Sequence, residues 1–140
     1  MSKDVNKKVL DFGCGSGILS IATQKMRASE VWSIDTDEFA IISSKENLKR
    51  SNLNVDNLIE GSIENLDNKL KFDVILANIS SNIIMKYSNE MKRKLNQNGI
   101  LIASGILSKN IEETLEKLQK AGFKLLSQTV EEEWECLVLN

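Results

Sequence analysis

The chain has 140 residues, 41% hydrophobic and 27% charged, which suits one globular domain with a real core. Its 18 basic and 20 acidic side chains leave a net charge of −2, which predicts no direct nucleic-acid binding, and no apolar run is long enough to span a membrane. With no histidine and only two separated cysteines, Cys14 and Cys136, we expect no metal site and no serine–histidine or cysteine–histidine pair.

The segment from Val9 to Ile18 is the most informative in the chain. It reads as an apolar strand over 8–12, then a loop with glycine at every second position, then a helix over 17–27. Glycine lets the backbone turn sharply and lets a ligand approach it, and the first turn of a helix has free N–H groups. The dinucleotide fingerprint G-x-G-x-x-G would need glycine where Ile18 stands.

The spacing Asp-x-Gly-x-Gly-x-Gly instead resembles the first motif of methyltransferases that depend on S-adenosylmethionine. It predicts that this loop binds that cofactor, with Asp11 and the glycines at its methionine end. The predicted cofactor-binding residues of the segment are Asp11, Gly13, Cys14, Gly15, Gly17 and Ile18. The helix that follows is predicted to carry its apolar residues on one face; these are Ile18, Ile21, Ala22 and Met26.

A second strand, predicted over 31–35, ends in the carboxylate of Asp35, 20 residues after Gly15. An acid at this place in an open α/β sheet accepts hydrogen bonds from ribose hydroxyls. We therefore predict that Asp35, with Thr36 beside it, binds the cofactor. Asp37 is the better candidate for the N-cap of the next helix, over 37–52.

Strands and helices continue to alternate after this point. Strands are predicted over 56–60, 72–78 and 100–104, and helices over 81–97 and 108–121. The strand over 72–78 is apolar almost throughout, which is typical of a strand buried on both faces. Two further strands, over 123–130 and 134–139, have only three residues between them, so they must pair antiparallel. The predicted fold is α/β: a doubly wound, Rossmann-like sheet of seven strands, mostly parallel, with a C-terminal antiparallel hairpin.

The chain resembles the catalytic domain of the ribosomal protein L11 methyltransferases, a family of class I S-adenosylmethionine-dependent enzymes. The resemblance covers about residues 8–139. Its segments are 10–19 (Leu-Asp-Phe-Gly-Cys-Gly-Ser-Gly-Ile-Leu), 35–37 (Asp-Thr-Asp), 77–79 (Ala-Asn-Ile), 104–107 (Ser-Gly-Ile-Leu) and, more weakly, Glu133-Trp134. It implies a bacterial, cytoplasmic, monomeric enzyme that methylates amino groups of a ribosomal protein and releases S-adenosylhomocysteine.

Asn78 is the predicted catalytic residue, because it ends the strand over 72–78 beside the expected position of the cofactor's methyl group. Methyltransferases of flat amides and base amines usually continue Asn-Pro-Pro-Tyr there, whereas this chain reads Asn-Ile-Ser-Ser. A flexible aliphatic amine is therefore the better substrate. Asn78 is also assigned to the cofactor site, and Ser62 and Ile63 are expected near adenine. Capping of the following helix is the alternative role for Asn78.

The family's enzymes carry an N-terminal substrate-recognition domain that is absent from these 140 residues. We therefore expect residues 1–140 to form a single catalytic domain, which would need that absent part to hold its ribosomal protein substrate. Three alternatives stay open: an N-methyltransferase for another protein or a small amine, a cofactor-binding fragment without activity, and a nicotinamide-dependent reductase. Ile18 and the terminal hairpin disfavour the last.

Overall fold

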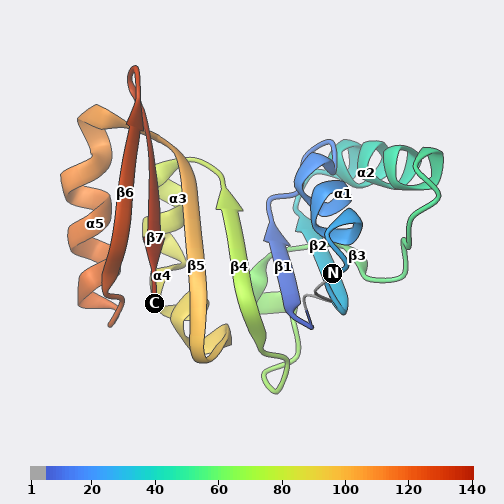
Figure 1. Ribbon diagram of the computed structural model, residues 1–140, viewed down its shortest axis with the longest axis horizontal. Coiled ribbons are helices and arrows are strands. Elements are labelled where there is room, and N and C mark those ends of the chain that lie inside the picture. Colours follow the sequence, from blue (N-terminus) through green and yellow to red (C-terminus); the bar gives the residue numbers. More distant parts are fainter. Residues whose placement is uncertain (1–5) are drawn as a thin grey trace, which may run out of the picture.

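Seven strands form one sheet in the computed structural model, which describes residues 6–140 (Figure 1). The order across the sheet is β3-β2-β1-β4-β5-β7-β6. All neighbours from β3 to β5 are parallel, while β7 runs antiparallel to both β5 and β6. The strands are β1 (Lys8–Phe12), β2 (Glu30–Asp35), β3 (Leu58–Glu60), β4 (Phe72–Asn78), β5 (Leu95–Leu107), β6 (Leu125–Glu131) and β7 (Trp134–Leu139). The predicted seven-stranded sheet and its terminal hairpin are confirmed.

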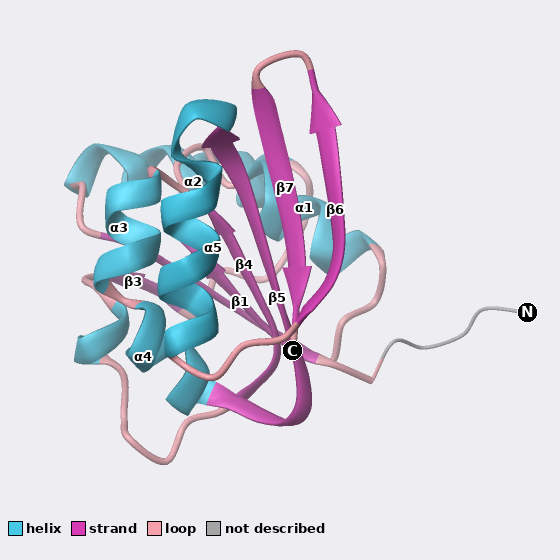
Figure 2. Ribbon diagram, turned by 90° about the vertical axis from the view of Figure 1, so that its left-hand side faces the viewer, coloured by secondary structure: helices cyan, strands magenta, loops and turns pink. Residues whose placement is uncertain are grey.

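Helices cover the two faces of the sheet unequally, as Figures 1 and 2 show. Over one face lie α3, α4 and α5, and over the β1–β3 half of the other face lie α1 and α2. The α-helices are α1 (Ile18–Lys25), α2 (Glu38–Arg50), α3 (Ser81–Lys86), α4 (Ser88–Lys94) and α5 (Ile111–Lys120); short 3₁₀ turns are η1 (Ile63–Asn65) and η2 (Ser108–Asn110).

The hydrophobic core lies between the sheet and the helices α3, α4 and α5. Register aligns the residues of the central strands that face these helices, and these residues are fully buried. The sheet residues at the centre of the core are Leu10, Ile75, Leu101, Ala103, Leu137 and Leu139. Alternate residues of the same strands point to the opposite face, because side chains along a strand alternate.

The predicted single helix over 81–97 is wrong at its middle and at its end. The chain forms two short helices that meet at Tyr87, whose φ of −104° and ψ of 16° interrupt the α conformation. The helix then ends at Lys94, and Leu95 already belongs to β5, where it pairs with Phe72 of β4. Strand pairing and burial thus override the helical spacing of the apolar residues.

The predicted apolar face of the first helix is also wrong. Ile18 is 69% exposed and Met26 66% exposed, whereas Ser20 is completely buried. The sheet beneath α1 presents polar side chains, Asp11 and Ser33, and Ser20 contacts both. The helix therefore turns a hydroxyl toward the sheet, because a buried carboxylate needs hydrogen-bond donors.

Strand β4 is buried on one face only. Val74 and Leu76, on the face away from α3, are half-buried, and so are Ile100 and Ile102 beside them on β5. No described helix lies over these residues in Figure 1. The prediction of a strand buried on both faces is therefore wrong for this half of the sheet.

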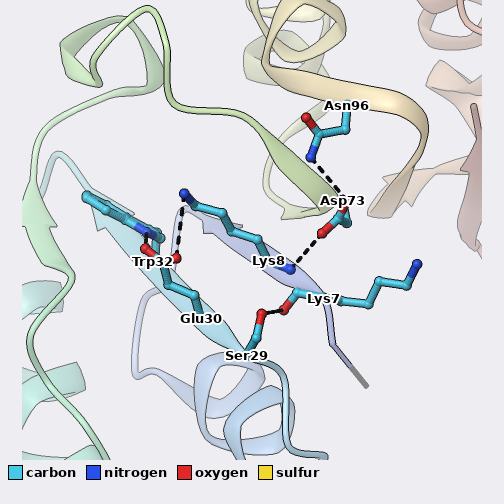
Figure 3. Close-up of polar contacts among 7 residues, drawn as sticks. All are labelled: Lys7, Lys8, Ser29, Glu30, Trp32, Asp73 and Asn96. Carbon is cyan, nitrogen blue, oxygen red and sulfur yellow. Dashed lines mark hydrogen bonds and ion pairs between the residues drawn. The ribbon is translucent and has the colours of Figure 1, made fainter. Parts of the chain in front are cut away.

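A polar cluster joins the amino ends of the central strands (Figure 3). Asp73 of β4 accepts hydrogen bonds from the backbone N–H of Lys8, at 2.9 Å, and from Nδ2 of Asn96, at 3.1 Å. On β2, Glu30 accepts from the indole N–H of Trp32 and lies 3.5 Å from the ammonium of Lys8. The backbone hydrogen bond from Lys8 is the main reason that the pKa of Asp73 is lowered.

Asp73→Asn is expected to lower the free energy of unfolding by about 1 kcal/mol at pH 7, because it weakens two hydrogen bonds to a carboxylate. A lowered pKa means that the ionised form stabilises the fold. This stabilisation is complete above about pH 5 and is lost as the pH falls through the folded-state pKa of Asp73. Urea unfolding of the parent and of Asp73→Asn should show that the difference between their free energies of unfolding becomes smaller as the pH is lowered from 7 to 3. Asp56→Asn, at an exposed aspartate, is the control, and a constant difference at all pH values would contradict the assignment.

Candidate functional site

A cavity of about 350 Å³ opens at the edge of the sheet where the parallel strands end. It lies beside the point where strand order reverses, between β1 and β4, which is where open α/β sheets bind ligands. Its walls come from the loops after β1, β2, β3 and β4 and from α3. The lining residues are Phe12, Gly13, Asp35, Thr36, Gly61, Ser62, Ile79, Ile83, Lys86 and Tyr87. The structure thus brings together four predicted site residues: Gly13, Asp35, Thr36 and Ser62.

Asp35 connects the glycine loop to the end of β2. Its Oδ2 accepts a hydrogen bond from the backbone N–H of Gly15 at 3.0 Å, and its Oδ1 accepts from that of Asp37 at 2.9 Å. A carboxylate has about four acceptor positions, so two remain for a ligand. Asp37 caps α2 through the N–H of Phe39, as predicted, which leaves Asp35 free of that role.

The three loop glycines have positive φ angles for different steric reasons. A Cβ on Gly13 would collide with Cγ2 of Ile79, and one on Gly17 would lie 3.1 Å from Cα of Ser44. A Cβ on Gly15, whose φ is +55°, would meet no atom within 4 Å. A side chain at position 13 would therefore displace Ile79 and one at position 17 would crowd Ser44, whereas Gly15 borders open space on which a ligand can lie.

Asp11 is deeply buried and engaged within the fold. Only 1% of it is exposed, and its Oδ2 accepts from the hydroxyl of Ser20 at 2.6 Å, which in turn lies 2.6 Å from that of Ser33. Burial raises the pKa of Asp11 above its ordinary value. The carboxylate holds α1 on the sheet and does not line the cavity. A contact between Asp11 and the methionine end of a cofactor stays a prediction.

Two other residues of the glycine loop differ sharply in exposure. Cys14 is buried, and its Sγ accepts a hydrogen bond from Ser44 at 3.3 Å. Burial raises the pKa of the Cys14 thiol to about 11, so it is protonated at neutral pH and is no nucleophile. Gly17 is the N-cap of α1, and Ile18 next to it projects into solvent.

The end of β3 contributes one predicted residue to the cavity and not the other. Ser62 lines it, with its backbone N–H held by Oδ1 of Asn65 at 2.7 Å in a capping box. Ile63 is completely buried in the core and is absent from the cavity wall.

The cavity wall formed by α3 was not predicted. Tyr87 packs edge-on against Phe12 with ring centres 5.6 Å apart, and its hydroxyl lies 3.4 Å from Oε1 of Glu64. The ammonium of Lys86 lies 5.2 Å from the centre of the Tyr87 ring. Ile83, which lies within the predicted helix over 81–97, is 37% exposed. The sequence signal that could have predicted this wall is the position of the helix, which directly follows the end of β4.

Asn78 lies at the same edge of the sheet, next to the cavity. It pairs with Ser104 of β5, and its side chain is exposed. Its neighbour Ile79 lines the cavity, whereas Asn78 does not. A group bound in the cavity would have to extend past Ile79 to reach Asn78. The catalytic role of Asn78 therefore stays a prediction.

The sheet order, the single reversed strand and a glycine-bordered cavity at the strand ends define the class I methyltransferase fold. A solved S-adenosylmethionine-dependent methyltransferase from Clostridium acetobutylicum shares this fold, with a TM-score of 0.80 at 16% identity over 99% of this chain and 85% of that one. The family model "Ribosomal protein L11 methyltransferase (PrmA)" matches residues 1–140. The chain belongs to the ribosomal protein L11 methyltransferase family.

Individual relatives agree with this assignment. Proteins named ribosomal protein L11 methyltransferase are 36% identical over 95% of this chain in Acetivibrio thermocellus and 38% identical over all of it in Campylobacter fetus. The crystal structure of a ribosomal protein L11 methylase from Lactobacillus delbrueckii has a TM-score of 0.92 at 27% identity, over 96% of this chain and 69% of that one. The chain spans 42% and 50% of the lengths of the first two relatives.

Within residues 6–140, no helix is long and apolar enough to cross a membrane. The same residues contain no group of three or more histidine, cysteine, aspartate or glutamate side chains arranged to hold a metal ion.

Proposed function

We propose that residues 1–140 form the catalytic domain of an S-adenosylmethionine-dependent methyltransferase that modifies amino groups of a bacterial ribosomal protein of the L11 type. The observation that carries the proposal is the cavity between β1 and β4, which is lined by Gly13 and Asp35. The N–H of Gly15 is hydrogen-bonded to Asp35, and the space beside Gly15 is open. Family membership supports the substrate class, since the relatives are named for it. A protein that modifies a ribosomal protein works in the bacterial cytoplasm.

The residues at the cavity fit an adenosyl group. Asp35 has two acceptor positions left, which suits the two hydroxyls of a ribose. Ile79, Ile83 and Tyr87 offer apolar surface for a purine ring, and Ser62 lies at the polar end of the wall. The methionine part of the cofactor would then extend over the open side of Gly15 toward Asn78. This path is free because glycine has no Cβ at position 15.

Bound S-adenosylmethionine would supply an electrophilic methyl group on a sulfonium centre. Asn78 would accept a hydrogen bond from the incoming amine with its side-chain oxygen and so aim the nitrogen lone pair at the methyl carbon. The substrate ammonium must first lose a proton to become a neutral amine. Partial desolvation favours this loss, and the proton can pass to water. The chain has no histidine to act as a base, so positioning supplies much of the acceleration.

Calorimetric titration of the chain is the direct test of the proposal. S-adenosylmethionine and S-adenosylhomocysteine are expected to bind with similar heats at one site, while NAD should give none. Binding of NAD alone would indicate the reductase alternative. The absence of heat with all three ligands would contradict the assignment of the cavity.

Asp35→Ala is expected to weaken S-adenosylmethionine binding by about 1.5–3 kcal/mol, a factor of roughly 10 to 150, through loss of hydrogen bonds to a carboxylate. It also frees the N–H of Gly15, which loosens the loop. The matched control is Asp37→Ala, two residues away. That variant removes the N-cap of α2, costs about 1 kcal/mol of stability and should leave affinity unchanged. Equal affinities for the folded Asp35→Ala variant and the parent would remove Asp35 from the site.

A further inference from the structure

Strand β5 contains an irregularity beside Asn78. Leu101 to Ala103 pair regularly with β7, but the register shifts before Ile106. Gly105 lies within this bulge with a φ of +74°, a conformation that side chains other than glycine rarely adopt. A bulge next to a functional site commonly redirects a side chain.

Asn78 occupies the space that the bulge provides. It is the register partner of Ser104, the residue before Gly105. A Cβ at position 105 would lie only 2.5 Å from Oδ1 of Asn78, which is closer than atoms can approach. This oxygen is the end of an exposed side chain, so any residue other than glycine at position 105 would force the Asn78 side chain to move.

Ile79, the residue after Asn78, also contacts the position of a glycine, on the other side of β4. Ile79 fills the space that a Cβ on Gly13 would need, and Gly13 follows β1. Strand β4 lies between β1 and β5 in the sheet. The dipeptide Asn78-Ile79 thus lies between two glycines, one directly after β1 and one within β5.

We propose that Gly105 is a positioning residue: its bulge sets the orientation of the Asn78 side chain, as Gly13 sets that of Ile79. The value of this orientation for methyl transfer rests on the role proposed above for Asn78. The packing relation itself does not, because it depends only on the two side chains. Ser104-Gly105 and Asn78-Ile79, which the sequence shows as separate motifs, would then act as one unit.

A double-variant cycle on the whole chain tests the proposal. The variants are Gly105→Ala, Asn78→Ala and the two combined, with Gly122→Ala as the control. Gly122 also has a positive φ, +103°, but a Cβ there would meet only the flexible side chain of Lys92, at 3.6 Å. Urea unfolding gives the stability of each protein. Gly105→Ala is expected to raise the unfolding equilibrium constant roughly tenfold more when Asn78 is present than when it is alanine.

Nuclear magnetic resonance of the side-chain amides reports orientation directly. The Asn78 signals are identified by their loss in Asn78→Ala, and they should shift in Gly105→Ala but not in Gly122→Ala. Signals of Asn65, held in its capping box, should stay in place in both. If Gly105→Ala fails to fold, the double variant should restore folding.

Additive stability effects, unmoved Asn78 signals, or a double variant no more stable than Gly105→Ala would each overturn the proposal. Calorimetry with S-adenosylmethionine separates it from the proposed function. Normal binding by the parent with no coupling between positions 78 and 105 overturns this inference alone. Coupling without any binding by the parent supports this inference and contradicts the proposed function.

Discussion

Gly15→Val is expected to abolish S-adenosylmethionine binding while the domain stays folded. The φ of Gly15 is +55°, which a β-branched residue adopts only with strain of about 1–3 kcal/mol. Its side chain would also fill the space in which no protein atom lies within 4 Å. Because strain and obstruction add, affinity should fall by about 100-fold or more. Calorimetry measures the binding, and circular dichroism with urea unfolding measures the fold.

Two companion variants separate strain from obstruction. Gly15→Asn tolerates the left-handed conformation but still places a side chain in the open space, so it should keep its stability and lose affinity. Gly122→Val introduces strain at the end of α5, far from the cavity, and should lose stability while keeping affinity. Normal binding by Gly15→Asn and Gly15→Val together would show that the ligand does not lie against this loop.

Asn78→Ala is expected to lower the rate of methyl transfer by about 100-fold or more and to leave S-adenosylmethionine affinity within about threefold of the parent. The reason is its location, since Asn78 lies beyond the cavity wall and pairs with β5. Rates are measured by transfer of a radiolabelled methyl group to ribosomal protein L11, with the chain extended by a family-type N-terminal substrate-recognition domain, and affinity is measured by calorimetry.

Asn96→Ala is the matched control for this experiment, because Asn96 is an exposed asparagine at the opposite edge of the sheet. It should change neither rate nor affinity. An equal loss of rate and affinity in Asn78→Ala would assign Asn78 to cofactor binding alone. An unchanged rate would end its candidacy as the catalytic residue.

The order of elements could be predicted because its signals are local. Strands β1, β4 and β7 have the predicted boundaries, since each is an apolar run ended by a turn or a polar residue. The short connection predicted before Trp134 required an antiparallel hairpin for geometric reasons, and the hairpin is present, with two residues between β6 and β7. Asp35 could be placed at the cavity because parallel strands end at one edge of the sheet.

The missed features depend on neighbours that are distant in sequence. The second helix ends at Lys94 because Leu95 pairs with Phe72, a contact that no helical periodicity contains. The buried face of α1 follows Asp11 and Ser33 rather than its own apolar residues. Tyr87 and Lys86 line the cavity because α3 directly follows the end of β4, whereas their sequence spacing indicated only that they belong to a helix.

By itself, the sequence determined the class of fold, the edge of the sheet that carries the site, and the loop and acid that border it, because glycine conformations, strand ends and short turns are properties of neighbouring residues. Only the tertiary structure decided which glycines serve packing and which borders open space. It also decided that the Asp11 carboxylate is hydrogen-bonded to Ser20 beneath α1 and that the Asn78 side chain lies against Gly105. Those outcomes depend on which side chains meet across strands and helices, and close packing allows only one answer at each such contact.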